Sequence, residues 1–81
     1  MKDREEIRSQ LTRVFRSVFE DDSIEITDTT TAKDIDSWDS LMHITLVISV
    51  EKDFGVRLSA AEVGKLENVG KMLDLLQKKI S

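Results

Sequence analysis

The sequence contains no cysteine, no proline and no tyrosine, and only three of its 81 residues are glycine. The absence of cysteine excludes disulfide bonds and metal sites built from thiolates. A single histidine, His43, also excludes a histidine-rich metal site. Because prolines are absent and glycines are few, little in the chain interrupts helices, and we expect an all-α fold.

Long apolar runs are absent as well. No stretch approaches the roughly 18 apolar residues of a membrane span, and the charged start of the chain lacks the apolar segment of a signal peptide. We therefore expect a cytoplasmic protein that does not enter the membrane, with a single domain over residues 1–81. A chain of this size buries only about 60% of its unfolded surface. That small core favours a carrier or binding module over an enzyme, and we expect no catalytic residues.

Charge is distributed unevenly along the chain. Residues 20–54 hold ten acids and two bases, whereas residues 1–19 and 55–81 each hold five bases and three acids. An acidic middle repels nucleic acid and anionic membranes and attracts a basic protein surface. A solvated acidic loop without a partner explains the same pattern equally well.

The first helix is expected over residues 3–19, where apolar residues recur at steps of three and four. Its bases, Arg4, Arg8, Arg13 and Arg16, occur together with Asp3, Glu5 and Glu6, which indicates a solvated, salt-bridged face more than nucleic-acid binding. The connection that follows, residues 24–37, is rich in Thr, Asp and Ser. A loop of this length is uncommon unless it is functional, and we expect Ile26 and Ile35 to hold it on the core.

The second helix is expected to begin at Asp39 or Ser40 and to end at Phe54. Gly55 suits the left-handed residue that follows a helix. The spacing places several apolar residues on one side, which we expect to be buried. These residues are Leu41, Ile44, Val47, Ile48 and Phe54, with Leu46 and Val50 widening the apolar arc.

Two further helices follow. The run Ser59-Ala60-Ala61-Glu62 matches a capping box and predicts a short third helix that closes near Gly64. Asn68 can cap a fourth helix, in which apolar residues again recur at steps of three and four up to residue 80. The prediction is a bundle of three long helices and one short helix, with a long loop between the first two.

The run from Asp36 to Gly55 resembles the phosphopantetheine site and second helix of acyl carrier proteins. An Asp-Ser-Leu triplet, here Asp39-Ser40-Leu41, opens the helix, a Leu-Val pair follows, and a Phe stands at its end. The resemblance extends through the capping box to Val69 and covers nearly the whole chain. It implies an acyl-carrier-like four-helix bundle.

The resemblance further implies a 4'-phosphopantetheine arm on Ser40, flanked by Asp39 and Leu41, that carries acyl groups as thioesters. Ser37 is also preceded by an aspartate, but the register to Phe54 and the following Leu41 select Ser40. The positive end of a helix dipole favours a phosphate at this position. The resemblance also implies that the bundle shelters acyl chains, with Ala60, Ala61 and Val63 lining the space. Plain core packing explains these three residues more simply.

The implied partners are a phosphopantetheinyl transferase and enzymes that load or process acyl groups through basic docking patches. Residues expected to face them are Asp36, Trp38, Met42, His43, Glu51 and Asp53. Many carriers of fatty acid synthesis have acids where this chain has Met42, His43, Thr45 and Lys52. Fewer acids weaken steering toward a basic patch, which indicates a dedicated pathway such as polyketide or specialised lipid synthesis. We expect a monomer.

Other groups of residues that could suggest a catalytic or metal site have simpler interpretations. Ser40 and His43 could share a helix face, but a hydrolase also needs an orienting acid, an oxyanion hole and a pocket. Asp34, Asp36 and Asp39 lack the glycine and glutamate spacing of an EF-hand calcium loop, so we expect no metal site. Trp38 could be an exposed recognition residue or a lid on the core.

Two alternative functions remain open at this point. A small helical adaptor would bind one protein partner without ever being modified. An aminoacyl or peptidyl carrier would share the Ser40 chemistry and differ only in its cargo.

Overall fold

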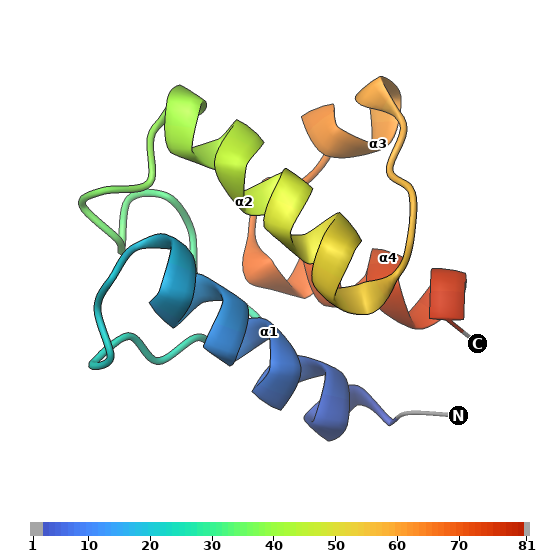
Figure 1. Ribbon diagram of the computed structural model, residues 1–81, viewed down its shortest axis with the longest axis horizontal. Coiled ribbons are helices and arrows are strands. Elements are labelled where there is room, and N and C mark those ends of the chain that lie inside the picture. Colours follow the sequence, from blue (N-terminus) through green and yellow to red (C-terminus); the bar gives the residue numbers. More distant parts are fainter. Residues whose placement is uncertain (1–2, 81) are drawn as a thin grey trace.

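The computed structural model describes residues 3–80, which form four helices. These are α1 (Arg4–Val18), α2 (Ser40–Phe54), α3 (Ala60–Gly64) and α4 (Val69–Ile80). Figure 1 shows α1 and α2 lying antiparallel and side by side, with α4 behind them and the short α3 at the edge. The predicted all-α fold of three long helices and one short helix is confirmed. Residues 1, 2 and 81 of the predicted domain lie outside the described part.

The predicted helix ends are set by local hydrogen bonds. The Asp3 carboxylate caps α1 by accepting from the Glu6 N–H at 2.9 Å. Gly55 ends α2 in the left-handed region with a φ of 66°, which glycine adopts without steric cost. Ser59 and Glu62 form the predicted capping box.

A single apolar core joins the elements. Each long helix and the loops contribute fully or nearly fully buried side chains to it. They are Ile7, Leu11, Val14 and Phe15 of α1, Leu46, Val47 and Val50 of α2, Val69, Met72, Leu73 and Leu76 of α4, and Ile24, Ile26, Trp38 and Leu66 outside the helices. No described helix is long and apolar enough to cross a membrane.

The long loop between α1 and α2 is fastened to the start of α4. The Val69 N–H donates to the Thr30 carbonyl at 2.9 Å, and the Gly70 N–H donates to the Asp28 carbonyl at 2.8 Å. A Cβ at position 70 would stand 2.7 Å from that carbonyl oxygen, so the approach requires glycine. As predicted, Ile26 is buried and Ile35 packs against the core.

Arg4 is tied to distant elements. It contacts Asp28 of the loop at 3.0 Å and Asp74 of α4 at 2.8 Å, and the hydrogen bonds to these two carboxylates raise its pKa. Arg8 pairs with Glu5 on its own helix, as predicted, and it also approaches Asp28 at 3.8 Å. The arginines Arg4 and Arg8 are therefore salt-bridged, as predicted, and the partners of Arg4 lie outside α1.

The prediction for the buried side of α2 is wrong in part. Val47 is buried and Phe54 packs against the core, but Leu41, Ile44 and Ile48 are 72%, 57% and 46% exposed. The core side of the helix instead runs through Leu46, Val47 and Val50. Apolar residues occupy two faces of α2, and its pattern alone does not show which one the bundle covers.

Candidate functional site

Ser40 is the first residue of α2 and is exposed to solvent. Asp39 precedes it as the cap, and its carboxylate accepts from the Met42 N–H at 2.9 Å. The Asp39 carbonyl accepts from the His43 N–H at 2.8 Å. The N–H groups of Ser40 and Leu41 are among those that a helix start leaves without partners inside the helix, so two donors lie beside the hydroxyl.

A cleft of about 440 Å³ opens beside Ser40, between the start of α2 and the α3 region. Its lining is more apolar than polar and includes Trp38, His43, Val63, Leu66 and Glu67. The cleft therefore offers apolar surface and hydrogen-bonding groups within reach of the Ser40 hydroxyl. Among residues 3–80, no three acidic or histidine side chains gather to hold a metal ion.

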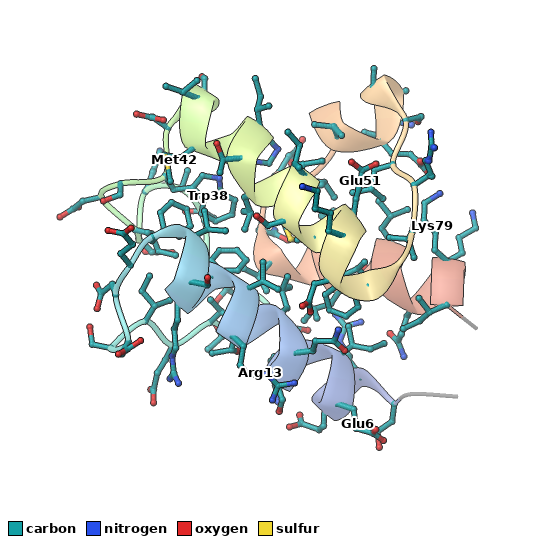
Figure 2. The ribbon with its side chains drawn as sticks, viewed as in Figure 1. Glu6, Arg13, Trp38, Met42, Glu51 and Lys79 are labelled. Atoms are coloured by element: carbon teal, nitrogen blue, oxygen red, sulfur yellow. The ribbon has the colours of Figure 1, made fainter. Side chains whose placement is uncertain are left out.

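Trp38 forms the inner wall of this cleft. Its side chain is only 6% exposed and lies between α1 and the start of α2 (Figure 2). The indole packs edge-on against Phe15, with ring centroids 5.3 Å apart and planes at 84°. Of the two interpretations of Trp38, the lid on the core is the one observed, and the expectation that it contacts partners is corrected.

His43 stacks on Trp38 and is hydrogen-bonded to it. The rings are 6.0 Å apart with planes at 18°, and the indole Nε1–H donates to His43 Nδ1 at 3.0 Å. Because Nδ1 accepts, the proton of the neutral imidazole belongs on Nε2, which faces the Val63 carbonyl at 3.5 Å. His43 is half-buried and links the start of α2 to α3, so only part of its ring is available for the surface contact that the sequence predicts.

Two acids expected to meet partners are engaged within the chain. The Glu51 carboxylate accepts from the Leu58 N–H at 2.8 Å, on the side of α2 that faces the segment leading to α3 (Figure 2). The Asp53 carboxylate accepts from Gln10 of α1 at 2.7 Å. Asp36 and Asp39 are exposed near Ser40, and Met42 is half-buried. Of these four acids, Asp36 and Asp39 therefore lie near Ser40, whereas Glu51 and Asp53 bind other parts of the chain.

The burial of some residues around the site differs from the sequence prediction. Ala60 and Ala61 are exposed, so neither packs in the core, whereas Val63 packs against it and lines the cleft. Leu66 was not predicted to take part, and no local pattern marks it. The exposure of Ile44 and Ile48 was also missed, although the excess of apolar residues on α2 beyond one stripe was a signal.

The bundle, the exposed serine at a helix start and the adjoining cleft define a carrier domain of the phosphopantetheine-binding class. A family model described as "Phosphopantetheine attachment site" matches residues 9–76. An acyl carrier protein of Thermotoga maritima is 30% identical over 80 residues, which are 99% of this chain and 99% of that protein.

A solved structure agrees with these sequence comparisons. The solution structure of the holo acyl carrier protein from Geobacter metallireducens superposes with a TM-score of 0.84 at 47% sequence identity, covering 89% of this chain and 83% of that one. The chain belongs to the acyl carrier protein family. Its prosthetic group is 4'-phosphopantetheine, and its function is that of an acyl carrier protein.

Proposed function

We propose that Ser40 is the residue that holds the phosphopantetheine arm and that the protein serves a dedicated acyl pathway. The main observation in favour of this attachment site is the position of Ser40. Its exposed hydroxyl is the first group of α2 and stands at the rim of the cleft. Ser37 is also exposed, but it lies in the loop before the helix.

The start of α2 suits a phosphodiester. The N–H groups of Ser40 and Leu41 and the positive end of the helix dipole favour a phosphate on the Ser40 oxygen. Ser40 would hold the arm as a phosphodiester: its oxygen would bond the phosphorus of phosphopantetheine, adenosine 3',5'-bisphosphate would leave as the phosphoanhydride bond of coenzyme A breaks, and the hydroxyl proton would pass to solvent or to a base of the transferase. The arm, once attached, supplies the thiol on which acyl groups are held as thioesters.

The carboxylates near Ser40 are better suited to attracting the transferase than to binding the phosphate. Asp39 lies next to the hydroxyl, and Asp36 precedes it in the loop. Both repel a phosphate but attract the basic surface of an enzyme that binds coenzyme A. We propose that these two carboxylates orient the transferase at the start of α2, while Asp39 also caps the helix.

An apolar ridge on α2 supports a docking role for this helix. Leu41, Ile44 and Ile48, which we call the α2 ridge, follow one exposed face at steps of three and four. Three large apolar side chains left in water at one place mark an interaction surface. We propose that acyl-processing enzymes cover this ridge. The basic patch expected on them would then face Asp36 and Asp39 and not the middle of α2.

The charge of α2 supports a dedicated pathway. Its first turn contains no acid, and Lys52 is in its last turn. Glu51 and Asp53 are engaged by Leu58 and Gln10. A partner selected by this surface must recognise apolar shape more than negative charge, which separates this carrier from those that rely on an acidic second helix.

Intact mass spectrometry tests the attachment site. The chain is incubated with coenzyme A and a phosphopantetheinyl transferase of broad specificity. We expect one added phosphopantetheine on the unchanged chain and on Ser37→Ala, and none on Ser40→Ala. Ser37→Ala is the matched control, because it removes an exposed serine that also follows an aspartate and lies three positions before Ser40. An arm lost in Ser37→Ala, or no arm on the folded chain, would contradict the proposal.

A further inference from the structure

We infer that the face of the bundle between α3 and α4 is a second docking surface, for a partner protein segment that presents an apolar side chain flanked by carboxylates. A cleft of about 240 Å³, which we call the α3–α4 cleft, opens on this face, and its accessible surface is almost wholly apolar. Leu66 and Leu75 are in its lining, together with three lysines, Lys65, Lys71 and Lys78. The charge that this surface seeks is therefore opposite to the charge that Asp36 and Asp39 attract near Ser40.

The three lysines of the α3–α4 cleft are available to a partner. All three are exposed. Within residues 3–80, none of them forms an ion pair with a carboxylate. Their ammonium groups can therefore pair with carboxylates of another protein without first breaking a contact inside this bundle.

The two acids that line the α3–α4 cleft are engaged by other parts of the chain. Glu62 accepts from the Ser59 N–H at 2.8 Å and pairs with Lys79 at 3.2 Å. Asp74 pairs with Arg4 at 2.8 Å. The charges of both acids are therefore offset, and the three lysines give this face a positive potential in a chain whose net charge is -4.

The register of α4 places lysines on both sides of the apolar floor. Lys71, Leu75 and Lys78 follow one another at steps of four and three, so they share one face of α4. Lys65 comes from the other wall, where it ends α3. A partner side chain that enters the cleft therefore lies between ammonium groups from two elements, and carboxylates on either side of it would meet them.

A protein segment fits this face better than an anionic membrane does. Proteins that lie on a membrane insert apolar side chains that project from their surface. Within residues 3–80, the large apolar side chains that project form the α2 ridge. Leu66 is 7% exposed and Leu75 is half-buried, so the α3–α4 cleft is hollow and the projecting side chain must come from the partner. An apolar anchor in a pocket with charged groups at its rim is a common source of affinity between proteins.

The α3–α4 cleft is separate from the surface that we propose for acyl chemistry. Leu66 lies between this cleft and the cleft beside Ser40, and it lines both. Neither Ser40 nor any residue of α2 lines the α3–α4 cleft. A partner bound there leaves Ser40 and the α2 ridge uncovered, so the carrier can be held through α4 while an enzyme uses α2.

The test selects a display library of random peptides against the full chain and locates the enriched peptides by NMR. We expect enrichment of peptides in which a large apolar residue stands between acids. These peptides should shift the methyl signals of Leu75 and the amide signal of Lys71, and should leave the methyl signals of Ile44 fixed. Their affinity should fall by about tenfold or more between low salt and ~1 M salt, where charges are screened within about 3 Å.

Two double variants of equal net charge sharpen the test. Lys71→Glu with Lys78→Glu reverses two charges of the α3–α4 cleft and should weaken peptide binding by about tenfold or more in low salt, because like charges then face each other. Lys33→Glu with Arg57→Glu is the matched control, since it reverses two exposed bases that line neither cleft, and it should bind as the unchanged chain does. All four side chains are exposed, so both variants should fold.

A transfer assay separates this inference from the attachment proposal. Phosphopantetheine transfer to Ser40 is followed by intact mass with and without a saturating amount of the enriched peptide, and we expect the same rate. A transfer that the peptide blocks overturns the independence of the two surfaces. A chain that gains no mass in either case contradicts attachment at Ser40 and leaves the peptide result standing.

Several results would overturn the docking surface itself. One is a library that enriches no peptide, or only peptides that are basic or that shift signals of α2 alone. Another is equal binding by the Lys71→Glu, Lys78→Glu variant and the unchanged chain. The partner is also wrong if the face binds only vesicles of phosphatidylcholine and phosphatidylglycerol in a flotation assay, or if sedimentation shows self-association that this variant abolishes.

Discussion

Helices α1 and α2 have the same length, 15 residues each, but they use their apolar residues differently. In α1 the large apolar side chains lie on one stripe, and Ile7, Leu11 and Phe15 are fully buried. In α2 they occupy two faces, one in the core and the other, the α2 ridge, in water. α1 therefore serves mainly to hold the bundle together.

The difference between the helices supports the proposal that α2 carries the docking surface. A protein of this size gains stability from each buried apolar side chain, so large apolar residues left exposed bring no benefit to the isolated bundle. Their benefit arises when another protein covers them. The start of the same helix places Ser40 beside the ridge, so an enzyme bound to α2 would be close to the proposed attachment site.

The largest effect is expected on stability, from truncation in α1. Leu11→Ala should lower the free energy of unfolding by about 2–5 kcal/mol, because it leaves a cavity at a fully buried position. Ile44→Ala on α2 removes a side chain that is 57% exposed and should cost about 1 kcal/mol or less. Urea unfolding of both variants measures the contrast.

The comparison between α1 and α2 fails if the two substitutions destabilise the protein equally. Leu46→Ala provides the control on α2, since its side chain is fully buried and its loss should match that of Leu11. The loss of stability should therefore depend on whether the substituted residue faces the core, and not on which helix contains it.

Local features of the fold could be predicted from the sequence. The bounds of α1 and α2 follow from apolar spacing, and the caps at Asp3, Asp39, Gly55 and Ser59 follow from residues that act within one turn of themselves. The proposed attachment site could be placed at Ser40 because the resemblance to acyl carrier proteins depends on a contiguous run of residues.

Features that depend on distant residues could not be predicted. The buried face of α2 depends on where α1 and α4 lie, and Arg4 meets Asp74, 70 positions away. Two interpretations of Trp38 fit the sequence equally well, because its burial depends on a tertiary contact with Phe15. The role of Leu66 between two clefts depends on the packing of α3, which contains no buried residue that could mark it.

An intermediate effect is expected on docking. Ile44→Ser should weaken binding of the transferase or an acyl-processing enzyme by about tenfold, since burying an isoleucine contributes about 1.5–3 kcal/mol. The loss should be the same in low and high salt. Asp36→Asn should weaken binding about twofold in low salt and have no effect in ~1 M salt, where charges are screened within about 3 Å. Calorimetry at both salt concentrations measures the loss of affinity in each variant. If the loss in Ile44→Ser depended strongly on salt, it would contradict an apolar ridge.

The smallest effect is expected at α3, which is held by its ends and not by buried side chains. The Ser59 N–H, and after it Lys79, lowers the pKa of Glu62 below its ordinary range. A carboxylate with a lowered pKa in the fold stabilises it at neutral pH, and this contribution is lost as the pH falls from the ordinary pKa of the residue through the lowered one. Amide hydrogen exchange over α3 should therefore show more frequent opening in acid than at neutral pH, relative to the core of α1. Glu62→Gln should open more at neutral pH and lose most of this pH dependence. If α3 opened equally at both pH values in the unchanged chain, the ionised capping box would not be what holds it.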